Sequence, residues 1–198
     1  MEQTADLLYA RCARSISFGR SSTLALARHC SFHLVPRIEL STFIDAPPER
    51  CFDLSRSVDF HQRSLNTTEE RAVAGVTRGL IGFGESVTWE ATHFGVRQRL
   101  TSRITAFERP VHFRDSMVNG AFRRFDHDHW FDLDPSGGTV VRDRFDFDAP
   151  FGWLGRVVNA LVLTRYMREL LRARNALLKH VAESDDWRLY LADASGAG

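Results

Sequence analysis

The stretch RIELSTFIDAPPERCFDL, residues 37–54, decides how the fold begins. Polar and apolar residues alternate over residues 37–44, which is typical of a strand with one buried face. The following residues are typical of a helix start, because Asp45 can accept from free backbone N–H groups and proline suits a first turn. The stretch therefore predicts a strand and then a helix through Leu54, and a second short helix fits residues 58–63.

Toward the C-terminus, most of the chain to residue 148 is predicted to form strands separated by turn signals. The predicted strands are residues 67–76, 85–93, 96–106, 111–118, 122–133 and 139–148. The turns fix the cross-strand partners, which are chemically favourable for several pairs. The predicted partners are Glu90 and Arg99, Ala106 and Phe113, Asp128 and Arg144, and His129 and Asp143.

After Pro150 the hydrophobic period becomes helical, and residues 151–182 carry a broad apolar stripe. A long antiparallel meander must bury one face, and only this helix is long enough to cover it. The sequence thus predicts an α+β fold: a curved seven-stranded antiparallel sheet around a long C-terminal helix, with two short helices after the first strand. Space between such a sheet and its helix is where small-molecule sites are found.

Composition limits the classes of function. The 198 residues suit one domain, predicted at residues 35–183, with a disordered or loosely ordered extension at 1–34 and a flexible tail at 184–198. A net charge of +1 gives no general attraction to nucleic acid or anionic lipid, and no apolar run is long enough for stable membrane insertion. The scattered Cys12, Cys30 and Cys51 indicate reduced thiols in a cytoplasmic protein.

Several segments together resemble the START-like, or SRPBCC, superfamily. They are the opening at residues 38–54, GESVTW at 84–89, ITAFERP at 104–110, FRD at 113–115 and FDHDHWF at 125–131. The resemblance covers roughly residues 36–182 and is nearest to bacterial ligand-binding proteins of the polyketide cyclase/dehydrase type. It implies the helix-grip fold. It implies no catalytic residues, because the superfamily includes transfer proteins, binders and enzymes.

The residues expected to line a ligand pocket come from the inner face of the sheet and from the last helix. They are Val87, Trp89, Ala91, Leu100, Ile104, Phe113, Asp115, Met117, His127, His129, Phe131, Asp143, Phe145, Trp153, Val158 and Leu161. Polar residues on a pocket wall need partners, since burying them unpaired costs free energy. The loop at residues 79–84 and the start of the last helix are expected to face each other at the pocket mouth and to admit ligand.

The His129–Asp143 pair is the candidate for chemistry. The aspartate can fix one imidazole tautomer and leave the other nitrogen as a base, or the two residues can form a hydrogen-bonded pair with no catalytic role. His127 and His129 alternate on one strand and point the same way, but a metal site needs further ligands, for which Asp143 and His93 are the candidates. No metal and no cofactor are expected, and no dinucleotide or phosphate-loop motif is present.

The expected function is the binding or carriage of a small apolar or amphipathic molecule between the sheet and the last helix. Two alternatives stay open from the sequence. One is an enzyme of the cyclase, dehydratase or hydrolase type that uses the inward His–Asp pair. The other is a regulatory interaction module without a ligand, which requires an exposed apolar patch.

Overall fold

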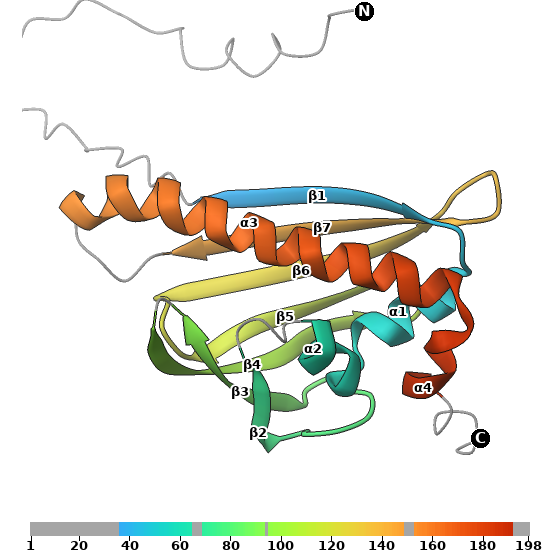
Figure 1. Cartoon of the computed structure of the whole chain (residues 1–198), viewed down its shortest axis with the longest axis horizontal. Helices are drawn as coiled ribbons and strands as arrows, with labels where there is room; N and C mark the ends of the chain where they lie inside the picture. The colour runs from blue at the N-terminus through green and yellow to red at the C-terminus, as the bar shows by residue number, and fades with distance from the viewer. Residues whose placement is uncertain (1–35, 65–68, 94, 149–152, 192–198) are drawn as a thin grey trace, which may run out of the picture. The chain divides into compact units, whose positions relative to one another are not determined.

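The computed structural model describes residues 36–64, 69–93, 95–148 and 153–191, with side chains in the last range from residue 162 onward. Seven antiparallel strands form one sheet in the order β1-β7-β6-β5-β4-β3-β2 (Figure 1). The elements are β1 (Arg37–Ile44), α1 (Pro48–Ser55), α2 (Val58–Ser64), β2 (Arg71–Gly75), β3 (Ser86–His93), β4 (Val96–Glu108), β5 (His112–Asn119), β6 (Arg124–Leu133), β7 (Thr139–Asp148), α3 (Trp153–Glu183), η2 (Asp185–Trp187) and α4 (Arg188–Leu191). This order confirms the predicted fold class.

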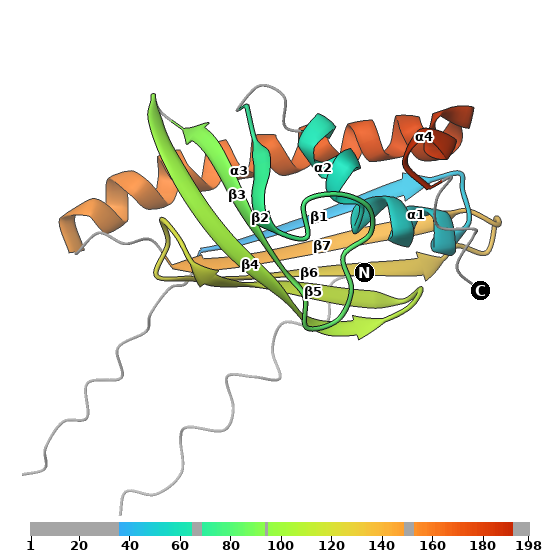
Figure 2. The same ribbon diagram turned by 90° about the horizontal axis from the view of Figure 1, so that it is seen from below.

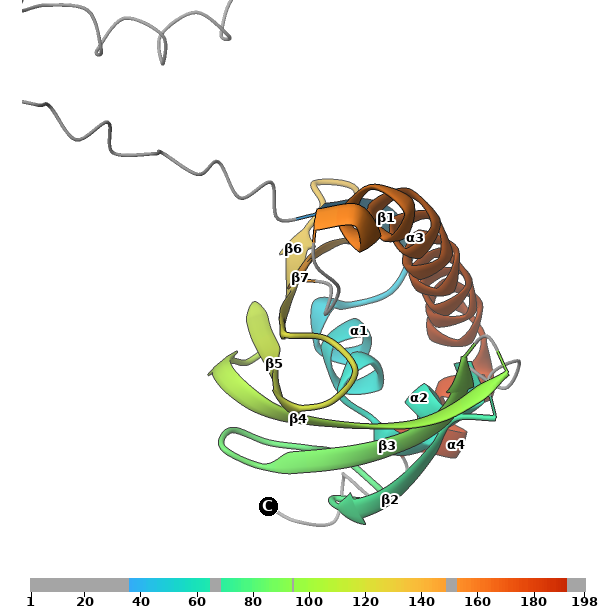
Figure 3. The same cartoon turned by 90° about the vertical axis from the view of Figure 1, so that its left-hand side faces the viewer.

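The sheet bends into a deep curve, and α3 runs along its open side (Figures 2 and 3). Helices α1 and α2 lie inside the same opening, between α3 and the sheet (Figure 3). Together the three helices cover the concave face, which places the buried side chains of the strands in one interior. Among the described helices, none is both long enough and apolar enough to cross a membrane.

The predicted register is confirmed in two hairpins and wrong in a third. Glu90 pairs with Arg99 in β3–β4, and the predicted pairing of β6 with β7 holds throughout. Between β4 and β5 the ladder shifts between Ile104 and Ala106, so Ala106 pairs with Arg114 and not with Phe113. Such a bulge adds one residue to one strand and re-aims the side chains beyond it.

Helix α1 is held against the sheet by an aromatic cluster. Phe52 is fully buried and meets the rings of Phe107, Phe113 and Phe131 edge-on, with centroids 5.3, 5.4 and 5.3 Å away. The helix starts as predicted with proline in its first turn, but the N-cap is Pro47 and no side chain caps it. The predicted capping role of Asp45 is therefore wrong. Its own backbone N–H donates to Glu183 Oε1 (2.8 Å), which ties the end of β1 to the end of α3.

The structure also corrects the predicted tail. Residues 185–191 are not a flexible extension but form η2 and α4, and Leu191 is buried. The Arg50 guanidinium lies 4.6 Å from the centre of the Trp187 ring, and Tyr190 meets Phe60 edge-on. The prediction overlooked the aromatic residues of this segment. Trp187 and Tyr190 bury apolar surface against α1 and α2, which holds the segment in place.

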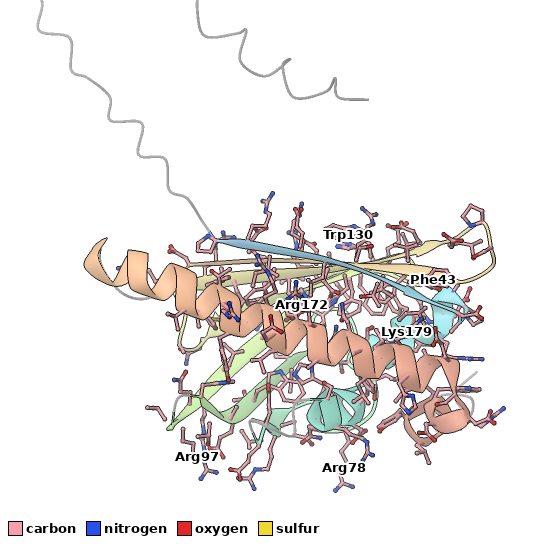
Figure 4. The ribbon with its side chains drawn as sticks, turned by 45° about the horizontal axis from the view of Figure 1, so that its top comes forward. Phe43, Arg78, Arg97, Trp130, Arg172 and Lys179 are labelled. Carbon is pink, nitrogen blue, oxygen red and sulfur yellow. The ribbon has the colours of Figure 1, made fainter. Side chains whose placement is uncertain are left out.

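The outer face of the sheet holds a buried carboxylate at the predicted pair of Asp128 and Arg144. Asp128 is 1% exposed and accepts from Arg114 Nε (2.7 Å) and Arg144 Nη2 (2.9 Å), while His112 Nε2 lies 2.8 Å away. Trp130, labelled in Figure 4, lies beside these arginines, with the Arg144 guanidinium 5.0 Å from its ring centre. Long side chains thus fold over Asp128 and exclude water from it.

Because of the Asp128 cluster, we expect the free energy of unfolding to fall as the solution becomes acidic. Burial alone raises the pKa of this carboxyl, but the hydrogen bonds from Arg114, His112 and Arg144 outweigh it and lower the pKa to about 2. A depressed folded-state pKa contributes stability that is present above the unfolded pKa of about 4 and is lost as pH falls toward 2. We expect Asp128→Asn to remove about 2 kcal/mol at pH 7.

The measurement is urea denaturation of both proteins from pH 7 down to pH 2. The difference between them should shrink over the acid range. Asp132→Asn is the control, because Asp132 is 44% exposed and its Arg142 partner is also exposed, so its loss should cost less than about 1 kcal/mol. Equal effects of the two substitutions at pH 7 would contradict the prediction.

Candidate functional site

A cavity of about 310 Å³ lies between the concave face of the sheet, α2 and α3. Most of its wall is apolar and comes from every strand between β3 and β7. The apolar side chains around it are Val58, Ile81, Val87, Trp89, Leu100, Ile104, Phe113, Ala121, Phe122, Phe125, Phe145, Leu163, Met167, Leu170 and Leu171. The strands alternate inward and outward side chains, which is why a predominantly apolar wall follows from the period-2 pattern of the sequence.

The structure brings most of the predicted pocket residues to this wall. Val87, Trp89, Leu100, Ile104, Phe113, Asp115, His127, His129 and Phe145 line the cavity. Four others lie around it but not on its surface: Ala91 is buried in β3, Met117 packs against a second core cluster, Phe131 packs under Phe52, and Asp143 lies behind the two histidines. The side chains of Trp153, Val158 and Leu161 lie outside the described residues.

A cluster of two histidines and two aspartates forms the polar part of the wall. His129 Nδ1 lies 2.7 Å from Asp143 Oδ1, as the register predicted, and His129 Nε2 lies 3.2 Å from Asp115 Oδ1. His127 Nε2 approaches the same oxygen of Asp143 at 3.2 Å. The two imidazole rings are 3.8 Å apart between centroids, and Phe113 stacks on His129 at 4.3 Å. One carboxylate oxygen therefore orients both rings.

Helix α3 holds Asp143 from the other side. Asn175 Nδ2 donates to Asp143 Oδ2 at 2.6 Å, and Arg174 Nη1 lies 3.7 Å from Asp143 Oδ1. Arg174 also donates to the backbone oxygen of Ser55 at 3.2 Å, which links the cluster to α1. Arg174 and Asn175 are both buried. A buried charge is tolerated when its partners are fixed in this way.

The pKa values of the two histidines are shifted in opposite directions. Burial disfavours the charged form of His129, but hydrogen bonds with Asp115 and Asp143 outweigh it and raise its pKa. Burial and the neighbouring His129 lower the pKa of His127. Burial alone would raise the pKa of Asp143, yet its hydrogen bonds with the two histidines hold it well below the usual range. His129 is therefore the imidazole that protonates more readily, between two ionised carboxylates.

A second polar group lies along the cavity wall nearer β2 and β3. His93 Nδ1 is 2.8 Å from the hydroxyl of Tyr166 on α3, and burial lowers the pKa of His93. His61 on α2 stacks on Trp89 at 4.2 Å, and its Nε2 lies 3.3 Å from Glu70 Oε1. The cavity therefore has hydrogen-bonding groups in two places: at the histidine–aspartate cluster, and here beside β2 and β3.

Sequence reasoning missed several polar residues of the site, from α2, α3 and the segment before β2. Arg174, Asn175, Tyr166, His61 and Glu70 were not among the predicted site residues, although all but Asn175 line the cavity. A signal was present, because Arg174 and Asn175 interrupt an apolar stripe between Leu170 and Leu178. The rotation of α3 about its axis, which turns them toward the sheet, cannot be obtained from the stripe alone.

The predicted pair of lips at the pocket mouth is wrong. The loop at residues 79–84 packs at the junction of α1 and α2, where Gly79 O accepts from the Val58 N–H (2.9 Å) and the Ile81 N–H donates to Arg56 O (3.2 Å). Ile81 is buried. In Figures 1 and 2, α3 begins at the left-hand end of the sheet, whereas the loop between β2 and β3 lies near the middle, close to α1 and α2. Residues 151 and 152 lie outside the described residues.

Comparisons with known proteins agree with this architecture. The model of the family described as polyketide cyclase / dehydrase and lipid transport matches residues 35–183. No curated protein sequence matches the chain. Similar solved structures include a protein of Thermus thermophilus, which is 20% identical with a TM-score of 0.57, over 72% of this chain and 97% of that one.

Two further structures extend the likeness. A Staphylococcus aureus protein of unknown function is 11% identical with a TM-score of 0.59, over 76% of this chain and 94% of that one. A START superfamily protein of Mycobacterium smegmatis is 8% identical with a TM-score of 0.56, over 73% of this chain and 98% of that one. At these identities the likeness shows the fold alone. The curved sheet, the long C-terminal helix and the family match together show that the chain belongs to the polyketide cyclase / dehydrase and lipid transport family and has the helix-grip fold of the START-like superfamily.

Proposed function

We propose that the protein binds a small apolar or amphipathic molecule in the cavity between the sheet and α3. The observation that carries the proposal is the cavity itself, because its volume of about 310 Å³ and its mostly apolar wall with a few convergent polar groups suit a small-molecule site. The family description, which names both a cyclase/dehydrase activity and lipid transport, supports a ligand of this class.

The wall indicates how such a ligand is oriented. Phe125, Phe145 and Leu171 provide an apolar surface on one side. His127 and the half-buried carboxylate of Asp115 offer polar atoms to a ligand headgroup on the neighbouring part of the wall. A molecule with one polar end and an apolar body satisfies both, since unpaired polar groups on a buried wall cost free energy.

Binding is favoured over catalysis by the His–Asp pair alone. Both ring nitrogens of His129 are engaged by carboxylates, at 2.7 Å by Asp143 and at 3.2 Å by Asp115. A general base needs a free nitrogen within hydrogen-bonding reach of its substrate. The hydrogen-bonded pair therefore acts as a fixed polar wall and not as a base on its own.

Filling the cavity should weaken ligand binding without unfolding the domain. Leu170 lines the cavity and is half-buried, whereas Val162 lies on the same helix and is 53% exposed. We expect Leu170→Trp to weaken binding of an apolar fluorescent dye such as anilinonaphthalene sulfonate by about tenfold or more, because the indole occupies ligand space. Val162→Trp should leave dye affinity unchanged.

Dye fluorescence titration of the three proteins is the measurement, with native mass spectrometry and solvent extraction of the purified protein to identify any bound molecule. Circular dichroism establishes that both variants keep the fold. Equal dye affinity for all three proteins, together with no bound molecule in the mass spectra, would overturn the proposed function.

A further inference from the structure

Three side chains on the cavity wall each offer one potential ligand atom, and these atoms lie close together. They are Asp115 on β5 and His127 and His129 on β6, and their ligand atoms all lie within 4.8 Å of one another. His127 and His129 share a face because side chains alternate along a strand, and Asp115 pairs directly with His127 across the two strands. The sequence placed Asp115 on the pocket wall but did not identify it as a third ligand beside the histidines.

In each histidine, the ring nitrogen that does not face the proposed ion is hydrogen-bonded to a carboxylate, as is common in metal centres. His127 Nε2 and His129 Nδ1 converge on Asp143 Oδ1, at 3.2 and 2.7 Å. Metal-binding histidines commonly donate their second ring N–H to a carboxylate, which fixes the tautomer and directs the other nitrogen at the ion. Asp143 is itself held by Asn175, so this orienting layer is complete.

One ligand atom of the cluster, Nδ1 of His127, makes no hydrogen bond to a side chain in the described part of the chain. His127 is 7% exposed, and its Nδ1 lies 3.9 Å from Asp115 Oδ1, beyond hydrogen-bonding distance. Among the described residues no other side chain offers this nitrogen a hydrogen bond. This nitrogen lies on the cavity wall, and an ion placed between the three side chains would be its partner.

We propose that Asp115, His127 and His129 form a site for one divalent transition-metal ion, of the class of Zn²⁺ or Fe²⁺. Two imidazoles and one carboxylate suit such ions, whereas Mg²⁺ and Ca²⁺ prefer oxygen ligands alone. Ligand atoms bound at about 2.0–2.2 Å in tetrahedral geometry lie about 3.3–3.6 Å apart. The observed separations of 3.2 and 3.9 Å from Asp115 Oδ1 bracket this range.

The three ligands leave a coordination position that faces the cavity, since all three residues line it. Three protein ligands with one open position are typical of sites that bind water or a small molecule at the metal. The ion therefore gives the cavity a strong acceptor site for an oxygen atom of its ligand. This step rests on the proposed function, whereas the metal site itself does not.

The test is isothermal titration of the full chain with Zn²⁺, after removal of any affinity tag and treatment with EDTA. We expect His127→Ala and Asp115→Asn to lose one bound ion per chain, or to bind it about a hundredfold more weakly. His93→Ala is the matched control, because His93 lines the same cavity but pairs with Tyr166, and it should keep that ion. Mg²⁺ should not bind at the site.

The readout is the difference in the number of bound Zn²⁺ ions between the full chain and each variant. A difference is needed because other residues, outside the described ones, can also bind Zn²⁺: Cys12, Cys30, His29 and His33. Visible absorption of bound Co²⁺, lost in His127→Ala and retained in His93→Ala, reports the same site spectroscopically. Circular dichroism establishes that the variants are folded. Equal ion binding by the full chain and by both ligand variants, or no binding at roughly 100 μM ion, overturns the metal site. Dye binding in EDTA, measured in parallel, tests the proposed function separately.

Discussion

Replacing Phe52 by alanine is expected to lower the free energy of unfolding by about 3–5 kcal/mol. The side chain is fully buried and meets three phenylalanine rings edge-on, each about 5 Å away. Alanine removes the apolar area, leaves a cavity that the surrounding strands cannot close, and loses the preferred ring geometry. Urea denaturation at pH 7 measures the loss.

The control is Phe83→Ala, because Phe83 is 69% exposed and should change stability by less than about 0.5 kcal/mol. Phe52→Ala should also disturb the site, because Phe52 supports Phe113 and Phe113 stacks on His129. A loss below about 1 kcal/mol, similar to the control, would show that α1 is not seated by this ring.

Replacing Asp143 by asparagine is expected to cost about 3–5 kcal/mol at pH 7. The carboxylate is 1% exposed and accepts from both histidines and Asn175. An amide places an NH₂ group where one oxygen now accepts, and it leaves the Arg174 cation buried without its nearest carboxylate. The control is Asp148→Asn on the same strand, which is half-buried and should change stability little.

The imidazole titration gives a second readout, measured by NMR in EDTA. Because the folded-state pKa of His129 is raised, its ion pairs contribute stability that is fully present below the unfolded pKa of about 6.5 and is lost as pH rises through the folded value. In Asp143→Asn this pKa should fall, and the stability difference from the native protein should shrink above neutral pH. An unchanged His129 pKa would contradict the role assigned to Asp143.

How far the sequence predicted the fold depended on how local the determining signal was. The β6–β7 register was predicted correctly because a short turn fixes it, and the opposition of Asp128 and Arg144 is chemically favourable. The β4–β5 register failed beyond Ile104, because a bulge inserts one residue without a distinctive residue type. The tail was misjudged because its aromatic residues find partners on α1 and α2, which are distant in sequence.

The site, too, could be predicted only where its determining contacts are local in the sequence. His129 and Asp143 face each other within one hairpin, so alternation along the strands places them together. Asp115 reaches the histidines across a different strand pair, and Arg174 and Asn175 reach Asp143 from a helix whose rotation the sequence does not specify. Asp128 lies on the outer face of the sheet and is still buried, with Arg114 and Arg144 donating to its carboxylate.

The pairing of β1 with β7 has a consequence for the order in which the chain can fold during its synthesis. Arg37 and Asp146 are partners, although 109 positions separate them. At about 5–20 residues per second, a ribosome takes roughly 5–20 s to make the strand that β1 needs. Contacts this distant in sequence close late and slow the search for the native state. A nascent chain that ends before residue 175 already carries both histidines but lacks Asn175, which donates to Asp143.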